Sequence, residues 1–276
     1  MTPRTADAPR DGWANPVAVM GNFCYKTLII TELEARKLRH DPTELISRAV
    51  QPALWLLVFG QVFGRLRATG TGNYRDFIAP GILAQSVLFI AIFYGIAIIW
   101  ERDLGIVHKF LVSPTPRAAL VLGKALSAGV RALSQVVIIY LLAMLLGVKL
   151  SGNPLHLLGV VVVVILGAAF FATFSLAIAC LVKTRERFMG IGQLMTMPLF
   201  FASNAIYPLS LMPHWLQIAA ALNPLSYEVD ALRTLMLRHV PPEFVAYSLP
   251  HDFLVLVVAT TVMIMLGAYL YPRVVT

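Results

Sequence analysis

The stretch FIAPGILAQSVLFIAIFYGIAIIW, residues 77–100, contains 24 residues and no charged side chain. A helix of this length measures about 36 Å, which exceeds the roughly 30 Å of hydrocarbon in a bilayer. The stretch lacks the alternation of polar and apolar residues that marks a barrel strand, so a helix is the form that satisfies its backbone hydrogen bonds internally, as lipid requires. It therefore predicts a membrane-spanning helix.

Five further apolar runs resemble this one, and the whole chain is 58% hydrophobic and only 13% charged. That composition excludes an ordinary soluble domain. We therefore predict an all-α membrane protein with six transmembrane helices. The predicted spans cover residues 46–64, 77–100, 131–148, 155–182, 188–208 and 253–271.

Residues 46–276 form the predicted transmembrane domain, and two shorter segments precede it. Residues 1–16 are rich in Pro, Asp and Arg and predict a disordered cytoplasmic tail. Residues 17–45 place apolar positions between charged ones such as Lys26, Glu32 and Arg36, which predicts an amphipathic helix at the membrane surface. The alternative is a solvated helix whose apolar face packs on its own protein.

The distribution of positive charge predicts the orientation. With both termini in the cytoplasm, 16 of the 22 Lys and Arg residues fall on the inner side and 6 on the outer side. The net charge of +8 then reflects topology and anionic membrane lipid, and no basic-aromatic surface indicates nucleic-acid binding.

An uncharged segment of 40 residues, 188–227, is too long for one straight helix. Its prolines predict a span to residue 208, a short helix near residues 215–222 at the outer interface, and a further short outer helix ending near Arg238. Asn223 and Pro224 suit the N-cap and first positions of that last helix. In the first span, the spacing of Gly60 and Gly64 favours close helix packing, which predicts a dimer seam with a partner chain.

Several functional classes lack their motifs. The chain has no phosphate-binding loop, no His-Glu-x-x-His, no Gly-x-Ser-x-Gly and no Cys/His cluster, so we expect no catalytic residue, metal or cofactor in this chain. The centres of the predicted spans lack the ionisable group that ion-coupled transporters usually carry. Two alternatives stay open: an ion-gradient-coupled transporter or channel, and a non-transporting membrane enzyme or assembly subunit.

A polar segment, residues 100–117, interrupts the apolar runs, and we call it the polar island. Glu101 or Asp103 suits a helix start, apolar residues follow, and Ser113-Pro114-Thr115-Pro116 suits a stop, which predicts a short amphipathic cytoplasmic helix. The alternative is an ordinary interfacial loop helix without a partner.

Two motifs then resemble those of type-2 ATP-binding-cassette (ABC) exporter permeases, most nearly the permeases of nodulation lipo-oligosaccharide and anthracycline exporters. The first is Trp-Glu-Arg-Asp-x-Gly at 100–105, followed by Phe-Leu-Val-Ser-Pro-Thr-Pro-Arg at 110–117 and Leu-Gly-Lys at 122–124. The second is Asn-Pro-Leu-Ser-Tyr-x-x-Asp-x-x-Arg at 223–233.

The resemblance implies the permease subunit of an ATP-driven exporter in the bacterial cytoplasmic membrane. Its partners would be two cytosolic ABC ATPase subunits, which carry ATP and Mg, and a second permease chain, identical or different. The polar island would be the coupling helix that contacts the ATPase. Its implied contact residues are Glu101, Arg102, Asp103, Gly105, Phe110 and Pro114.

The same resemblance implies a substrate path along the second and fifth spans. Aromatic side chains there suit a lipid-like, drug-like or glycolipid substrate, with a polysaccharide as second choice, and uncharged polar groups suit hydrogen bonds to it. The alternative is that the aromatic residues face lipid or fill the core, and that Asn204 bonds a neighbouring helix. The candidate path residues are Phe93, Gln193, Phe200, Phe201 and Asn204.

Overall fold

The computed structural model describes residues 42–66, 73–105, 117–182 and 184–271, with the single positions Tyr25, Ile29 and Glu32. The predicted tail 1–16 and most of the predicted interfacial helix 17–45 lie outside the described residues. In the described part the elements are helical. In chain order they are α2 (Pro42–Leu66), α3 (Tyr74–Asp103), α5 (Arg117–Leu145), α6 (Pro154–Leu181), α7 (Arg185–Phe201), η1 (Leu209–Leu211), α8 (His214–Leu222), α9 (Pro224–Met236), η2 (Pro242–Phe244) and α10 (Leu249–Leu270).

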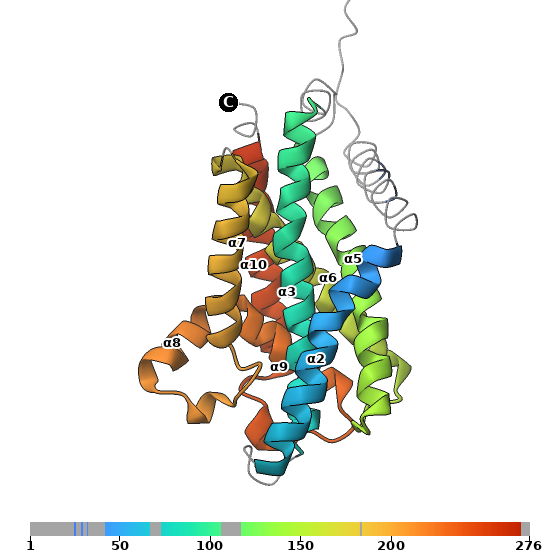
Figure 1. The fold of residues 1–276 in the computed structure, drawn as a ribbon. Helices are drawn as coiled ribbons and strands as arrows, with labels where there is room; N and C mark the ends of the chain where they lie inside the picture. Colours follow the sequence, from blue (N-terminus) through green and yellow to red (C-terminus); the bar gives the residue numbers. More distant parts are fainter. Residues whose placement is uncertain are drawn as a thin grey trace, which may run out of the picture.

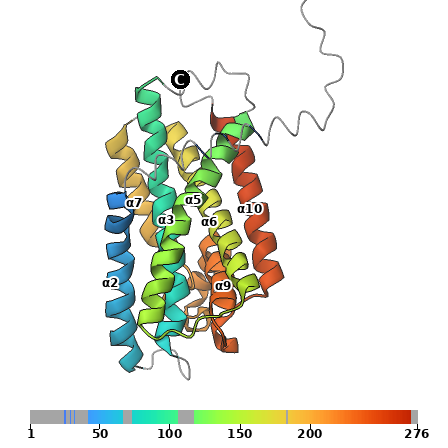
Figure 2. The same ribbon diagram turned by 90° about the vertical axis from the view of Figure 1, so that its right-hand side faces the viewer.

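The long helices run side by side in one bundle, with α3 through its centre (Figures 1 and 2). At one end α3 stops, α7 starts and α10 finishes; we call it the Gly105 end. At the other end α2 connects to α3, α5 connects to α6, and the short helices α8 and α9 lie between α7 and α10; we call it the α8 end. Successive connections therefore lie at alternate ends of the bundle, as in a protein that crosses a layer several times.

Helix α3 is the core element, since 21 of its 30 residues are buried. It packs against α2, α5, α6, α7 and α9. Small residues allow these close approaches: a Cβ added at Gly81 would collide with the backbone of Ala205, and one at Gly95 with Ser175 and Phe188. A helix surrounded in this way offers few positions where a charge can meet water, which explains why residues 77–100 carry no charged side chain.

Four helical segments are long and apolar enough to cross a membrane: Tyr74–Asp103, Arg117–Leu145, Pro154–Leu181 and Pro242–Leu270, which contains α10. Helix α2 carries a shorter apolar stretch, Val50–Val62. Helix α7 has 17 residues and a charged first turn. The prediction of an all-helical, multi-pass membrane protein is confirmed, and four of the six predicted spans meet the criterion of length and hydropathy.

Two predicted boundaries are wrong. Helix α5 begins at Arg117, not at residue 131, so Lys124 and Arg131 lie within the helix. Lys124 is buried against a carboxylate, and the guanidinium of Arg131 lies 5.5 Å from the ring centre of Tyr94, so each charge is compensated inside the bundle. The expectation that every span centre lacks an ionisable group therefore fails for α5.

The second wrong boundary is the end of the fifth predicted span, because α7 stops at Phe201, not at residue 208. Beyond it, the predicted short helix and the predicted N-cap at Asn223 are confirmed, as α8 covers His214–Leu222 and Asn223 caps α9; the position of α8 at the outer interface stays a prediction. Helix α9, however, is not a surface helix: 11 of its 13 residues are buried, and it packs against α3, α6 and α10. Two of its charged residues, Asp230 and Arg233, have partners inside the bundle.

Candidate functional site

The first candidate region is the Gly105 end of α3. Glu101, Arg102 and Asp103 form the last turn of this helix, so they do not start a separate helix as predicted. Gly105 then adopts φ +69°, a left-handed conformation in which glycine carries no steric penalty, and its N–H bonds the carbonyl of Arg102 at 2.9 Å. The predicted coupling residues Phe110 and Pro114 lie outside the described residues.

Glu101 faces into the bundle. Its side chain is largely buried, and the ammonium of Lys124 lies 2.5 Å from its Oε2 atom. A buried ion pair of this kind is costly to break, because either partner alone would be left as an unpaired buried charge. Glu101 and Lys124 therefore join α3 to α5. The outward-facing charges of the polar island are those of the residues next to Glu101.

Arg102 and Asp103 face outward and connect α3 to the turn between α6 and α7. Arg102 donates to the carbonyl of Val182 at 3.2 Å, and Asp103 accepts two hydrogen bonds from Arg185, at 2.7 and 3.1 Å. The guanidinium of Arg185 also lies 3.6 Å from the ring centre of Trp100. These contacts form a partly exposed charged platform. Sequence reasoning missed Arg185, because its distance along the chain hides the contact.

The second candidate region is a groove of about 350 Å³ between α2, α3 and α7. Three amide side chains and two phenyl rings dominate its lining, which thus offers hydrogen bonds without charge beside apolar aromatic surface. Gln85 is 2% exposed, and neither of its amide atoms has a hydrogen-bond partner in the described part of the chain. The lining residues are Gln51, Pro52, Gln85, Ser86, Phe89, Ile90, Phe93 and Gln193.

The five predicted path residues separate in the structure. Phe93 and Gln193 line the groove, and Phe201 is exposed on α7. Phe200 is buried and packs edge-on against a tryptophan of α2. Asn204 is buried and donates to Asp230 of α9 at 3.3 Å, so it bonds a neighbouring helix, the alternative named above.

Helix α9 is held by a buried network around Arg233. The guanidinium donates to the carbonyls of Phe244 and Asn204 at 2.8 and 2.9 Å, and it lies 3.6 Å from Asp230. Asp230 in turn accepts from the backbone N–H of Tyr247 at 2.8 Å. Burial lowers the pKa of Arg233 to about 10, and burial raises the pKa of Asp230 against the opposing effect of its hydrogen bonds. The network ties α9 to the segments on both sides of it.

Two further residues, one just before α9 and one within it, explain the position of this helix. Asn223 accepts from the N–H of Leu225 at 3.1 Å as the N-cap, with Pro224 in the first turn, and its amide donates to the carbonyl of Leu199 at 2.6 Å, which links α9 to α7. Glu228 is fully buried, and no described group bonds its carboxyl, so burial raises its pKa well above the usual value. Gly167 of α6 makes room for this carboxyl, since a Cβ there would collide with it.

The predicted dimer seam at Gly60 and Gly64 stays a prediction. Gly60 is buried within the chain, and a Cβ there would make an ordinary contact of 3.4 Å with Arg75 of α3. The side-chain surroundings of Gly64 lie outside the described residues. Among the described residues, no group of three His, Cys, Asp or Glu side chains is arranged to hold a metal ion.

Comparison with known proteins assigns the family. Residues 25–237 match the family described as ABC-2 type transporter. The chain belongs to this ABC-2 family. It is 33% identical over 221 residues to the "Putative transport permease ycf38" of Cyanophora paradoxa, covering 77% of this chain and 74% of the relative.

Two bacterial relatives are also similar to this chain. The "Daunorubicin resistance ABC transporter permease protein DrrB1" of Streptomyces coeruleorubidus is 28% identical over 198 residues, covering 72% of this chain and 70% of the relative. The "Nodulation protein J" of Rhizobium leguminosarum bv. trifolii is 27% identical over 198 residues, covering 71% and 74%. The family match contains the Gly105 end, the groove and α9, and the resemblance to ABC-2 permeases inferred from the two motifs is confirmed.

Proposed function

We propose that this chain is the transmembrane permease subunit of an ATP-driven exporter. Two such subunits, identical or different, would pair with two cytosolic ATPases that bind ATP and Mg. The proposed position is the bacterial cytoplasmic membrane with both termini inside and six crossings, made by α2, α3, α5, α6, α7 and α10. The family match carries this proposal, together with the absence of a phosphate-binding loop from the sequence.

The proposed contact with the ATPase is the charged platform at the Gly105 end. Arg102 and Asp103 are partly exposed there, at 20% and 38% of their side-chain surface, and Arg185 lies beside them at the start of α7. A docked subunit that moves this platform would move α3 and the α6–α7 turn together, because hydrogen bonds join them. Helix α3, which ends at this platform, and helix α7, which begins there, also line the groove between α2, α3 and α7, which gives ATP hydrolysis a mechanical route to that groove.

A charge exchange tests this assignment. Asp103→Arg and Arg185→Asp should each lower ATPase stimulation and export, and the double exchange rebuilds the internal ion pair with opposite polarity. If the platform contacts the ATPase, the double variant stays uncoupled, because the partner still meets reversed charges. Full recovery of export in the double variant would show instead that only the internal pair matters. Co-purification with the ATPase and ATP-dependent accumulation of substrate inside inverted vesicles are the measurements.

We further propose that the groove between α2, α3 and α7 receives an uncharged, partly aromatic region of a lipid-like or drug-like substrate. Gln85 supports this, since a buried amide without a partner costs free energy that a bound polar group can recover. Gln85→Leu should change the relative export of chemically different substrates, with the complex still assembled. Gln135→Leu is the matched control, because Gln135 is a buried amide equally without a described partner that does not line the groove. Equal loss in both variants would contradict the proposal.

A further inference from the structure

A second hollow lies at the α8 end, where two connections far apart in the sequence meet. The loop between α5 and α6 pairs with the segment after α9 through the antiparallel bridge of Leu150 and Leu237. The N–H of Arg238 donates to the carbonyl of Lys149 at 3.0 Å, and the N–H of Ser151 donates to that of Met236 at 2.7 Å. Backbone pairing thus fixes two basic residues, Lys149 and Arg238, next to each other.

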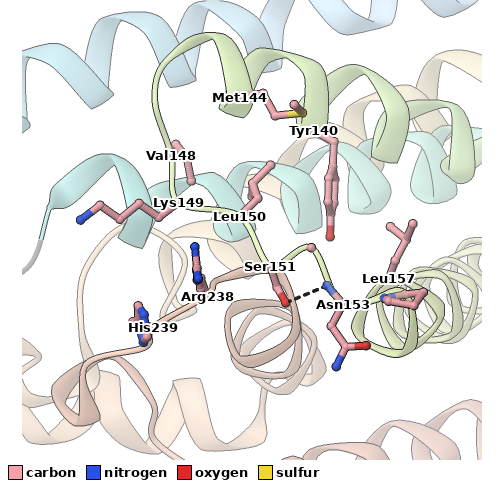
Figure 3. A pocket seen from close by; sticks show the side chains of 12 residues that line it. Tyr140, Met144, Val148, Lys149, Leu150, Ser151, Asn153, Leu157, Arg238 and His239 are labelled. Atoms are coloured by element: carbon pink, nitrogen blue, oxygen red, sulfur yellow. Dashed lines mark hydrogen bonds between the residues drawn. The ribbon is translucent and has the colours of Figure 1, made fainter.

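The hollow beside them has a volume of about 870 Å³ and two chemically different sides. Lys149, Arg238 and His239 lie toward one side, and Tyr140 and Leu157 lie toward the other (Figure 3). Lys149 and Arg238 are both exposed. The apolar side also opens outward, as Met144 is 65% and Leu157 46% exposed on helices whose composition is that of membrane spans.

The charge of the hollow is positive. None of its lining residues is acidic. Outside the lining, Asp76 accepts from the backbone N–H of Lys149 at 3.3 Å and attracts its ammonium, whereas no described carboxylate pairs with Arg238. Two permanent cations above exposed apolar and aromatic surface match a ligand with an anionic head and a hydrocarbon tail.

We propose that this hollow binds an anionic phospholipid from the leaflet at the α8 end. The phosphate lies between Lys149 and Arg238, and an acyl chain descends along Tyr140, Met144 and Leu157 between α5 and α6. A tyrosine with basic residues at a helix end is the arrangement that suits the boundary between headgroups and hydrocarbon. A free anion would use the cations but leave the apolar half of the hollow empty, so the lipid uses more of the observed surface.

Native mass spectrometry of the full-length chain tests the proposal, with phosphatidylglycerol and phosphatidylcholine of identical acyl chains as probes. Each basic residue near an anionic surface strengthens binding about fivefold. The double variant Lys149→Gln/Arg238→Gln should therefore bind phosphatidylglycerol about 30-fold more weakly, with phosphatidylcholine binding unchanged. The control is Arg117→Gln/Arg187→Gln, which removes the same charge from two exposed residues near the Gly105 end and should leave the binding intact. Equal weakening in both double variants would overturn the proposal.

A second measurement separates the lipid from a soluble anion. Glycerol 1-phosphate carries the phosphate without hydrocarbon, so it should fail to displace phosphatidylglycerol from the wild-type chain. Met144→Asn should weaken phosphatidylglycerol binding although all cations are present. Efficient displacement by glycerol 1-phosphate, or no effect of Met144→Asn in a variant with the wild-type melting temperature, would assign the hollow to free anions and overturn the lipid proposal.

Discussion

Helices α8 and α9 follow each other in the chain, but the apolar helix is exposed and the charged helix is buried. A soluble protein would show the reverse. Helix α8 is apolar, yet Trp215 is 69% and Leu222 79% exposed. Helix α9 carries Glu228, Asp230 and Arg233, and all three are fully buried. In a membrane protein an exposed apolar helix meets lipid at no cost, whereas a polar helix needs partners that only the protein interior supplies. The comparison shows that partners, and not polarity alone, decide which helix is inside.

The largest effect is expected where a buried charge loses its partner. Arg233→Leu removes the counter-charge of Asp230 and the donor to the backbone carbonyls of Phe77, Asn204 and Phe244, which should cost about 3–5 kcal/mol of stability and abolish the folded protein in detergent. Arg233→Lys keeps the charge without the planar geometry and should lose part of this. Thermal melting and folded yield after solubilisation measure it. A wild-type melting temperature for Arg233→Leu would show that α9 does not depend on its buried network.

A smaller effect is expected where α9 meets α6. Gly167→Ala places a Cβ against the carboxyl of Glu228, and such overpacking should cost about 1–3 kcal/mol. Shortening the opposing side chain in Gly167→Ala/Glu228→Ala removes the collision, so the double variant should be more stable than Gly167→Ala alone. A double-mutant cycle with melting as readout checks this. Additive losses would mean that the two residues are not in contact.

The smallest effect is expected on α8. Trp215→Ala and Ile218→Ala remove exposed side chains and should each change stability by less than about 0.5 kcal/mol. If lipid covers this face, Ile218→Asp should instead reduce insertion or raise the solvent accessibility of α8, as seen by cysteine labelling of neighbouring positions. A large loss of stability for Trp215→Ala would indicate that another protein segment covers α8.

The wrong start of α5 and the burial of α9 have one physical origin. Hydropathy reports the average environment of a segment, so it placed Lys124 and Arg131 in a loop and did not predict the burial of Asp230. In the structure Lys124 pairs with Glu101, Arg131 lies over Tyr94, and Asp230 bonds α9 to its neighbours. Each compensating group lies far away in the sequence, or on another helix, and no local pattern identifies it.

Features that depend on neighbouring residues could be predicted from the sequence. The charge-free run 77–100 required a helix, Asn223 and Pro224 required a helix start, and the two motifs pointed to the ABC-2 family. The tertiary structure alone decided which polar groups face one another: the pairing of Asp103 with Arg185, the groove around Gln85, and the meeting of Lys149 with Arg238. Such contacts depend on how helices pack in three dimensions, and packing is a property of the whole bundle.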